Sequence, residues 1–404
     1  MISVEEALAR LLEPLETLPP EQVSVADAVG RVLAEDVAAR RTQPPFAVSA
    51  MDGYAVRAED VATVPTTLRI VAEIPAGAGF GGRLGTGEAA RIFTGAPLPD
   101  GADTIVIQED TERHDNEVEV REGAPSGTYV RRAGLDFAAG DVLLHKGERL
   151  TPRHIGLAAA MNRPWLHVYR RPRIGILSTG DEIVMPGDPI GPHQIVSSNA
   201  LALSAFVTAC GGVPVLVGNA PDDPDALRTI AAAAQGTDLF VTTGGVSVGE
   251  HDLVRDVLSE EGLAIDFWQI AMRPGKPLMV GRYRGVPMLG LPGNPVSTLV
   301  CSLLFLRPAM EKLSGVPQLP IEPPLARLGV ALKKNDRRQD YLRAQYILAS
   351  DGVMDVVPFQ AQDSSMMHPL AAADCLVIRP PHAPAAEPGT MVPIVTFPGG
   401  AWPL

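Results

Sequence analysis

The segment from residue 173 to 313 alternates continuous apolar runs with glycine-bearing loops and amphipathic stretches. The apolar runs are RIGILS (173–178), VPVLVG (213–218), DLFVTT (238–243) and VPMLGL (286–291). The amphipathic stretches cover residues 199–210, 223–235, 252–261 and 295–313. Apolar strands that alternate with helices form βαβ units, in which the helices cover both faces of a parallel sheet. This alternation therefore predicts a central α/β domain.

The segments that flank the α/β unit are predicted to be β-rich. Residues 46–145 hold short period-two runs separated by glycine turns, which favours a β-barrel or a sandwich. At the N-terminus, Ser3 and Glu6 have the spacing of a capping box on a short helix. We therefore expect a multidomain α/β protein with a helical and β-barrel-like N-terminal region and a small C-terminal β-barrel. The expected domains are I (1–45 and 146–172), II (46–145), III (173–316) and IV (317–404).

The charge and the cysteine content exclude several classes of protein. The chain has 34 Lys and Arg against 47 Asp and Glu, and this net charge of −13 repels nucleic acid and anionic membranes. The N-terminus is acidic where a signal peptide is basic, and no apolar run approaches the roughly 20 residues that span a bilayer. Cys210, Cys301 and Cys375 do not form a disulfide framework pattern, which favours reduced core cysteines. We therefore expect a cytoplasmic protein that binds neither nucleic acid nor membranes.

Acidic residues and glycines are concentrated in the loops that follow the predicted strands. STGDEI contains Asp181 and Glu182, NAPDDPD contains Asp222 and Asp223, TTGGVSVGEHD contains Glu250 and Asp252, and LPGNPVS follows the fourth strand. Ligands bind beyond the carboxyl ends of the strands in such sheets. Glycines allow the backbone to approach a phosphate, and a helix that begins near Asp252 would direct its free amides at the anion. Carboxylates beside a phosphate are explained if they hold Mg²⁺.

These residues also have a purely structural interpretation, which the sequence leaves open. Asp222, Asp223 and Asp252 have the residue type and the position of helix N-caps. Arg273 and Lys276 of MRPGKP either present two cations on a proline-stiffened loop or are ordinary solvated charges. The chain has no G-x-x-x-x-G-K-[ST] loop and no G-x-G-x-x-G at the start of a helix, which excludes ATP hydrolysis by that route and NAD chemistry.

Three further polar residues lie among small residues in the N-terminal half. They are Asp52 in SAMDGYA, Thr94 in RIFTGAPLP and Asp136 in RRAGLDFAAGD. A segment of this composition either meets a substrate or forms an ordinary β-turn with a polar tip. The residues alone leave both interpretations open.

Six segments in a fixed order resemble the motifs of a known family. SAMDGYA, TGAPLP, STGDE, GGVSVGEHD, PGKP and LPGNPVS closely resemble those of the MoeA-type molybdopterin molybdenumtransferases, the family that includes the E domain of gephyrin. The resemblance runs from about residue 3 to 397. GGVSVGEHD also fits the related molybdopterin adenylyltransferases, but those are single α/β domains, so the flanking β domains favour the molybdenumtransferase.

The resemblance implies an L-shaped homodimer of four-domain subunits. Its active site would lie between the α/β domain of one subunit and the SAMDGYA region of the other. The implied substrates are adenylylated molybdopterin and molybdate, with Mg²⁺-dependent cleavage of the pyrophosphate bond, release of AMP and transfer of molybdenum to the dithiolene. Phosphoanhydride cleavage needs positioning and charge neutralisation more than a protein nucleophile. Implied partners are the adenylyltransferase and apo-molybdoenzymes or their chaperones.

The positions of the motifs imply roles for individual residues. The functional polar residues of the family fall at Asp52, Thr94, Asp136, Glu182, Asp222 and Asp252. Of these, Asp222 and Asp252 are expected to hold Mg²⁺, directly or through water, and Glu182 is expected to lie near the pterin. Lys276, Ser297, Arg343 and Ser364 are expected to cradle molybdate. The other expected substrate contacts are Gly244, Gly245, Ser247, Gly249, Arg273, Pro292, Gly293, Asn294 and Pro295.

The chain departs from the family pattern at three places. Ala47-Val48 stands where Asp-Asn is usual, Arg273 stands where Lys is common, and Asp363 and His368-Pro369 replace Gly and Ser-Ser. An inward-pointing Asp363 would repel the oxyanion.

Two other functions remain open at this point. One is adenylyl transfer from ATP to the pterin phosphate. The other is a non-catalytic scaffold that binds pterin or a partner protein. Retention of Asp52, Glu182, Asp222 and Asp252 argues against the scaffold.

Overall fold

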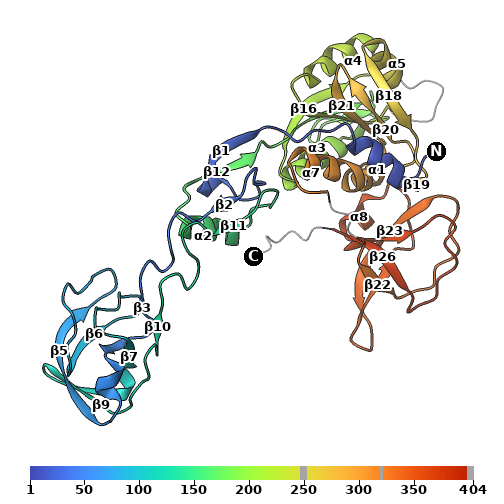
Figure 1. Ribbon diagram of the computed structural model, residues 1–404. Helices are drawn as coiled ribbons and strands as arrows, with labels where there is room; N and C mark the ends of the chain where they lie inside the picture. Colours follow the sequence, from blue (N-terminus) through green and yellow to red (C-terminus); the bar gives the residue numbers. More distant parts are fainter. Residues whose placement is uncertain (246–252, 319–321, 398–404) are drawn as a thin grey trace.

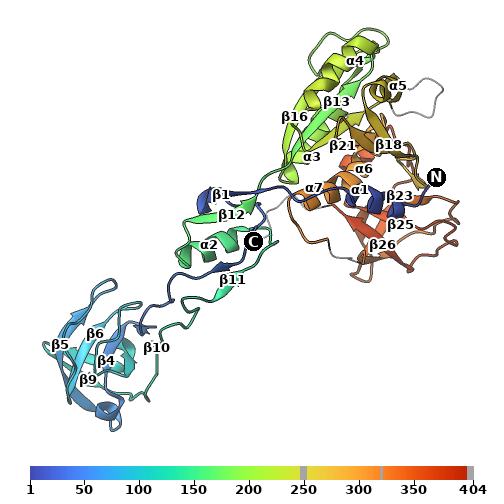
Figure 2. The same cartoon turned by 45° about the horizontal axis from the view of Figure 1, so that its top comes forward.

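The computed structural model describes residues 1–245, 253–318 and 322–397. Figure 1 shows an elongated molecule in which domain II lies at one end and domains III and IV lie side by side at the other. Domain I lies between them, and the rotated view in Figure 2 shows the same arrangement. The expected boundaries between these domains stay a prediction.

Domain III has the predicted parallel strands at its centre. β13 (Arg173–Thr179), β16 (Val213–Ala220), β17 (Leu239–Thr243) and β21 (Val286–Leu291) run parallel in the order β16–β13–β17–β21. The sheet continues with β20 (Met279–Tyr283) and β18 (Leu263–Trp268), each antiparallel to its neighbour. Arg284 and Gly285 form a two-residue turn with positive φ at both positions, which forces the β20–β21 pair into a hairpin. The sheet is therefore mixed, and the pattern of strand and helix does not predict its last two strands.

Helices cover both faces of this sheet. α3 (Asn199–Ala209), α6 (Pro295–Cys301) and α7 (Arg307–Leu313) pack on one face, and α4 (Pro224–Ala231) and α5 (Leu253–Glu260) pack on the other. Neighbouring residues of β17 point to opposite faces of the sheet. Val241 is buried against α3, α6 and α7, and Phe240 is buried against α4 and α5. These helices fall within the predicted ranges.

The predicted helix over residues 295–313 contains an irregular turn. A π-helical segment at Ser302–Leu306 separates α6 from α7. Pro308 lies in the first turn of α7 and has no amide hydrogen to donate to the preceding turn. The wider π turn accommodates that missing hydrogen bond.

The N-terminal helix α1 (Val4–Leu12) packs into the core of domain III, although the division by sequence places it in domain I. Ala7, Leu11 and Leu15 are buried in the same hydrophobic cluster as α6 and α7. The N-cap Ser3 accepts a hydrogen bond from the Glu6 amide at 3.0 Å, whereas the Glu6 carboxylate accepts from Arg10 at 2.6 Å. Half of the expected capping box is therefore formed between these residues.

Domain I consists of two strand pairs and one helix. β1 (Pro20–Ser24) pairs with β12 (Trp165–Tyr169), β2 (Val37–Ala38) pairs with β11 (Val142–Leu144), and α2 (Pro152–Ala160) packs against them. Each pair joins one strand from before domain II to one strand from after it. Domain II is therefore inserted into domain I.

Domain II contains a sheet in the order β7–β4–β6–β5–β9–β8. Tyr54 and Ala55, neighbours on β4, are buried in two different clusters, so both faces of the sheet carry apolar residues. β3 (Val48–Ser49) pairs with β10 (Val130–Arg131) at the junction with domain I. The sheet strands are β4 (Gly53–Val56), β5 (Thr66–Ile74), β6 (Glu88–Ile92), β7 (Thr104–Ile107), β8 (Thr111–His114) and β9 (Glu117–Val120).

Domain IV is a closed β-barrel, as the sequence predicts. β22 (Leu325–Leu328), β23 (Gln339–Leu348), β24 (Met354–Pro358), β25 (Cys375–Arg379) and β26 (Met391–Thr396) close through the β23–β25 pairing, and α8 (Met367–Ala371) lies between β24 and β25 in the chain. β19 (Met272–Arg273) from domain III adds to this sheet in parallel with β23.

Domain III also contains a short two-stranded parallel ribbon, which follows β13 in the chain. Its strands are β14 (Ile183–Val184) and β15 (Ile195–Val196).

The sequence predicts neither a membrane-spanning segment nor a disulfide bond. Within the described residues no helix has the length and apolarity needed to cross a membrane. Cys210, Cys301 and Cys375 are free thiols, as the sequence predicts.

The burial of α1 leads to a prediction about stability. Leu11→Ala is expected to lower the free energy of unfolding by about 2–4 kcal/mol, because it leaves a cavity in the domain III core. Leu12→Ala removes a half-buried side chain from the same helix and is expected to cost less than about half of that. Urea denaturation followed by circular dichroism measures both, and equal losses would contradict the packing described here.

Candidate active site

A cavity of about 1160 Å³ lies at the carboxyl ends of the parallel strands, where domain III meets domain IV. Five segments of domain III contribute most of its wall, and domain IV adds Arg338 and residues of the 362–365 loop. The cavity brings together twelve of the residues expected from the sequence: Glu182, Asp222, Gly244, Gly245, Arg273, Lys276, Pro292, Gly293, Asn294, Pro295, Ser297 and Ser364.

The loop after β17 requires glycine at two consecutive positions. Gly244 and Gly245 both have positive φ (+88° and +63°). A Cβ on Gly244 would lie 3.0 Å from the Thr179 carbonyl oxygen, and a Cβ on Gly245 would collide with the Val254 side chain. Bare backbone at this strand end is therefore a steric necessity as well as an exposed surface for an anion.

The two acids after β16 have different roles. The Asp223 carboxylate caps α4 by accepting from the Ala226 amide at 2.8 Å. Asp222 lines the cavity, and its amide donates to the Asp181 carboxylate at 3.0 Å, which fixes the turn. The capping interpretation thus holds for Asp223, while the Asp222 side chain lines the cavity and caps no helix among the described residues.

The N-terminal end of α6 is joined to domain IV by polar contacts. The Asn294 side chain donates to the Ser364 hydroxyl at 2.9 Å, and the Val296 amide donates to the Ser364 carbonyl at 3.1 Å. The Asn199 amide group of α3 ties this turn to β17 by donating to Gly293 and to Thr243. Ser297 is buried beside them and lines the cavity.

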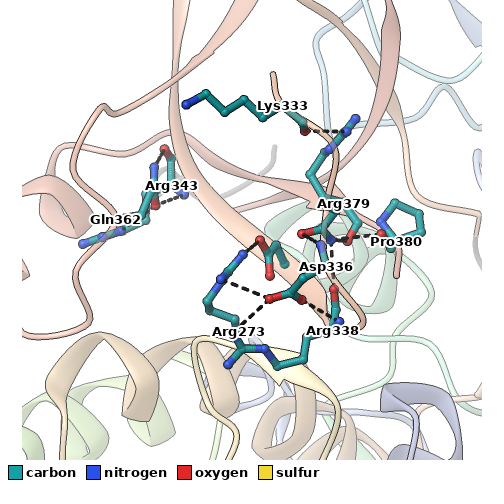
Figure 3. A network of polar contacts seen from close by, with 10 residues as sticks. Arg273, Lys333, Asp336, Arg338, Arg343, Gln362, Arg379 and Pro380 are labelled. Carbon is teal, nitrogen blue, oxygen red and sulfur yellow. Dashed lines mark hydrogen bonds and ion pairs between the residues drawn. The ribbon is translucent and has the colours of Figure 1, made fainter. Parts of the chain in front are cut away.

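The two cations of MRPGKP are not equivalent. Arg273 forms ion pairs with Asp340 and, at 3.5 Å, with Asp336 of domain IV, and its hydrogen bond to Asp340 raises the pKa of the guanidinium (Figure 3). Lys276 lines the cavity and forms no ion pair with any residue that the structure describes. Arg273 therefore links the domains, and Lys276 is the cation left for an anionic ligand.

Arg343 lies outside the cavity wall, which corrects the role expected from the sequence. Its side chain is 1% exposed and donates to the carbonyls of Ala361, Asp363 and Met366. Burial lowers the pKa of this guanidinium. Arg343 therefore holds the loop that carries Ser364 and does not contact the cavity itself.

Arg338, and not Arg343, is the arginine of domain IV that lines the cavity. Its guanidinium donates to Asp336 at 3.1 Å (Figure 3).

Asp363, which would repel an oxyanion if it pointed into the cavity, is engaged within its own loop. Its carboxylate accepts from the amide and the hydroxyl of Ser365. These bonds lower the pKa of Asp363 and turn its carboxylate into its own loop.

Asp52, Thr94 and Asp136 belong to the part of the chain at the far end of the molecule. Asp52 precedes β4 of domain II, and Figure 1 shows this domain separated from domain III by domain I. The Asp52 carboxylate accepts from the Thr94 amide at 2.7 Å and the Thr94 hydroxyl at 2.8 Å, which lowers its pKa. Asp136 is exposed. One subunit therefore does not bring these three residues to its own cavity.

Three expected site residues, Ser247, Gly249 and Asp252, lie outside the described residues.

The cavity wall also contains residues that sequence reasoning missed. The serines and the asparagine of VSSNA, at the start of α3, give a recognisable signal, because small polar residues open a helix after a ribbon. The missed residues in the wall include Ser178, Thr179, Ser197, Ser198, Asn199, Arg338, Gln362 and Ser365.

This arrangement defines a class of protein. A parallel α/β sheet presents glycine turns and a carboxylate at one edge, and a β-barrel closes that edge with further polar groups. In α/β proteins, ligands bind at this edge of the sheet. The class is a multidomain α/β protein with a ligand-binding cavity between two of its domains.

Comparison with known proteins identifies the family. Residues 2–162 match the MoeA N-terminal region (domain I and II), residues 175–312 match the probable molybdopterin binding domain, and residues 325–397 match the MoeA C-terminal region (domain IV). The chain therefore belongs to the MoeA family of molybdopterin molybdenumtransferases.

Individual relatives agree with this assignment. The chain is 36% identical over 404 residues to molybdopterin molybdenumtransferase 2 of Mycobacterium tuberculosis, with 98% of this chain and 99% of that protein covered. It is 44% identical over 304 residues to the molybdopterin molybdenumtransferase of a Nostoc species, with 73% and 70% covered. The solved structure of the molybdopterin biosynthesis moeA protein from Pyrococcus horikoshii has a TM-score of 0.83 at 27% identity, with 98% of this chain and all of that chain covered. The family, the fold class and the transferase activity expected from the sequence are confirmed.

Proposed function

We propose that this enzyme converts adenylylated molybdopterin and molybdate into molybdenum cofactor, with Mg²⁺-dependent release of AMP. The observation that carries the proposal is the cavity between domains III and IV. Its wall contains the carboxylates of Glu182 and Asp222, the bare backbone of Gly244 and Gly245, and the cation of Lys276, which forms no ion pair with a described residue. A phosphoanhydride and an inorganic oxyanion need these groups together.

The residues of the cavity fit Mg²⁺. Asp222 and Glu182 both line it, while the described residues contain no cluster of three or more His, Cys, Asp or Glu. Two carboxylates suit Mg²⁺, which keeps several waters and takes further ligands from substrate phosphates. Bound there, Mg²⁺ would offset the negative charge of the pyrophosphate during its cleavage. As the family resemblance implies, we propose Asp222 and Asp252 as its protein ligands; Asp222 lines the cavity, and Asp252 lies outside the described residues.

Molybdate is proposed to bind at the other side of the cavity. Lys276 supplies one positive charge, and Ser297 and Ser364 supply hydroxyl donors to a tetrahedral dianion. Arg338 supplies the second cation in place of Arg343, because its guanidinium has donors left after its bond to Asp336. Asn294 orients the Ser364 hydroxyl through their hydrogen bond.

The remaining catalytic residues are proposed to come from a second subunit. Asp52 and Asp136 lie far from the cavity of their own chain, and exposed apolar side chains flank them in sequence, with Phe46 52%, Met51 40% and Leu135 54% exposed. Large apolar side chains that are exposed close to functional polar residues in the chain favour a protein contact in this region. In the proposed homodimer, domain II of each subunit completes the cavity of the other. A cytoplasmic location, and contact with the adenylyltransferase and with apo-molybdoenzymes or their chaperones, belong to the same proposal.

The direct test measures AMP and active cofactor after mixing the protein with adenylylated molybdopterin, Mg²⁺ and molybdate. Asp222→Asn is expected to reduce AMP release by about 10²-fold, because it removes a charge that neutralises the pyrophosphate. Asp223→Asn is the matched control, since asparagine caps a helix about as well as aspartate. Equal rates for the Asp222 variant and the wild type would remove Asp222 from the mechanism.

A second variant tests the oxyanion site. Lys276→Ala is expected to raise the molybdate concentration for half-maximal cofactor formation by about 10-fold or more, because a charge-assisted hydrogen bond is lost. Lys333→Ala removes an exposed lysine of domain IV that does not line the cavity and serves as control. An unchanged molybdate requirement in the Lys276 variant would exclude it from the oxyanion site.

Mixing two inactive variants tests the shared site. Asp52→Ala and Asp222→Asn subunits are each expected to be inactive as homodimers. After denaturation and refolding together, roughly a quarter of the wild-type activity should return, because half of the dimers are mixed and each has one intact site. No recovery, with mixed dimers demonstrated by differently tagged subunits, would show that each chain uses its own domain II.

A further inference from the structure

One arginine of domain II lies beside the Asp52–Thr94 pair. Arg91 is on β6, directly opposite Tyr54 of β4 and three positions before Thr94. Its side chain is half-buried and forms no ion pair with a residue that the structure describes. Four other arginines of this domain each pair with a glutamate: Arg57, Arg69, Arg113 and Arg121. Arg91 therefore keeps its positive charge uncompensated by a carboxylate of the described chain.

Two aromatic rings contact the Arg91 guanidinium. Its central carbon Cζ lies 5.1 Å from the centroid of the Tyr54 ring and 5.0 Å from the centroid of the Phe93 ring. Both distances fall within the range of a cation–π contact, which extends to roughly 6 Å. Tyr54 is buried and Phe93 is half-buried, so the rings are themselves held by the domain. The two rings therefore fix the plane in which the guanidinium lies.

Hydrogen bonds join the same guanidinium to the backbone around Asp52. Nη1 of Arg91 donates to the Gly53 carbonyl at 3.2 Å, and Nη2 donates to the side-chain oxygen of Gln108 at 2.7 Å. The backbone amide of Gln108 in turn donates to the Asp52 carbonyl at 3.2 Å. Arg91 thus contacts the residue that follows Asp52 and the residue that holds the Asp52 carbonyl.

The contacts of Arg91 reach both members of the pair. Gly53 follows Asp52 in the chain, and Phe93 precedes Thr94. The bonds from the Thr94 amide and hydroxyl to the Asp52 carboxylate, and after them the charge of Arg91, lower the pKa of Asp52. A displacement of Gly53 or Phe93 would therefore change how the carboxylate and the hydroxyl are presented.

We propose that Arg91 is a positioning residue, whose guanidinium fixes the Asp52 carboxylate and the Thr94 hydroxyl in the orientation in which domain II presents them to the substrate. Arg91 acts through this pair and does not contact the substrate itself. A displacement of about 1 Å can lower a rate by about 10²-fold, so the orientation of the pair matters for catalysis. The inference rests on the proposed function, in which domain II completes the cavity of a second subunit.

The experiment measures AMP release by the full chain over a range of adenylylated molybdopterin concentrations. Arg91→Met is expected to lower kcat by about 10- to 100-fold and to change KM by less than about 2-fold, because the lost contacts orient a reacting group without binding the substrate. Arg91→Lys keeps a positive charge beside the rings and should restore part of kcat.

Arg69→Met is the matched control. Arg69 lies on β5, which is paired with β6 in the same sheet, but its partner is Glu88 and its side chain is 67% exposed. This variant should keep the kcat of the wild type. An unchanged kcat in Arg91→Met would overturn the proposal, and so would a raised KM with an unchanged kcat, which would show that Arg91 binds the substrate directly.

Mixed dimers separate positioning from a loss of folding. A dimer of one Asp52→Ala and one Asp222→Asn subunit has one intact site, built from the cavity of the first chain and domain II of the second. Arg91→Met added to the Asp222→Asn chain should lower the recovered activity by about 10-fold or more, whereas the same change added to the Asp52→Ala chain should not alter it. An equal loss in both mixtures would assign the effect to folding or dimerisation and overturn the proposal.

Failure of this inference and failure of the proposed function give different results. Absence of AMP release by the wild type would contradict the proposed function and this inference together. Absence of recovery in the mixture without the Arg91 change would do the same for the shared site. A fully active Arg91→Met enzyme, beside a normal wild type and a normal recovery, would overturn the positioning role alone.

Discussion

The active cavity exists because domain IV is held over the carboxyl edge of the domain III sheet. β19 of domain III pairs in parallel with β23 of the barrel, and in that register Arg273 lies opposite Asp340 and forms an ion pair with it. The Asp340 side chain is 6% exposed, so it depends on its partner, and removing one member of a buried pair typically costs about 3–5 kcal/mol. Half-exposure of Arg273 reduces that figure here. Without this junction, Arg338 and Ser364 would not face Lys276 and Ser297.

The distribution of charge within the cavity matters more than the charge of the chain. A net charge of −13 would repel an oxyanion and a pyrophosphate at long range. The structure offsets this locally, since Asp223 and Asp363 are engaged in their own turns while Lys276 is left without an ion pair among the described residues. The carboxylate of Asp222, which lines the cavity, caps no helix in the described part of the chain.

Much of this architecture could be predicted from the sequence, because it depends on local patterns. The strands after residues 173, 213, 239 and 286 and the helices between them follow from hydrophobic periodicity, and the glycine turns follow from backbone conformations that only glycine adopts readily. The strand-and-helix pattern did not predict β18 and β20. β20 joins the sheet through the β20–β21 hairpin, and β18 then pairs antiparallel with β20, so no crossover helix marks their place in the sheet. Arg343 and Arg338 are five positions apart in one segment, and nothing local indicates which guanidinium the barrel buries.

The amino-acid sequence by itself determined the family, the order of the domains and the set of loops that carry chemistry, because motifs and periodicity are properties of neighbouring residues. Only the tertiary structure decided which polar groups of those loops remain available. It assigned Asp223 to a helix cap, Arg273 to the junction with domain IV and Arg343 to a loop. Such assignments depend on contacts between segments distant in the chain, and a hydrogen bond or ion pair made there removes a side chain from the groups that a ligand can use.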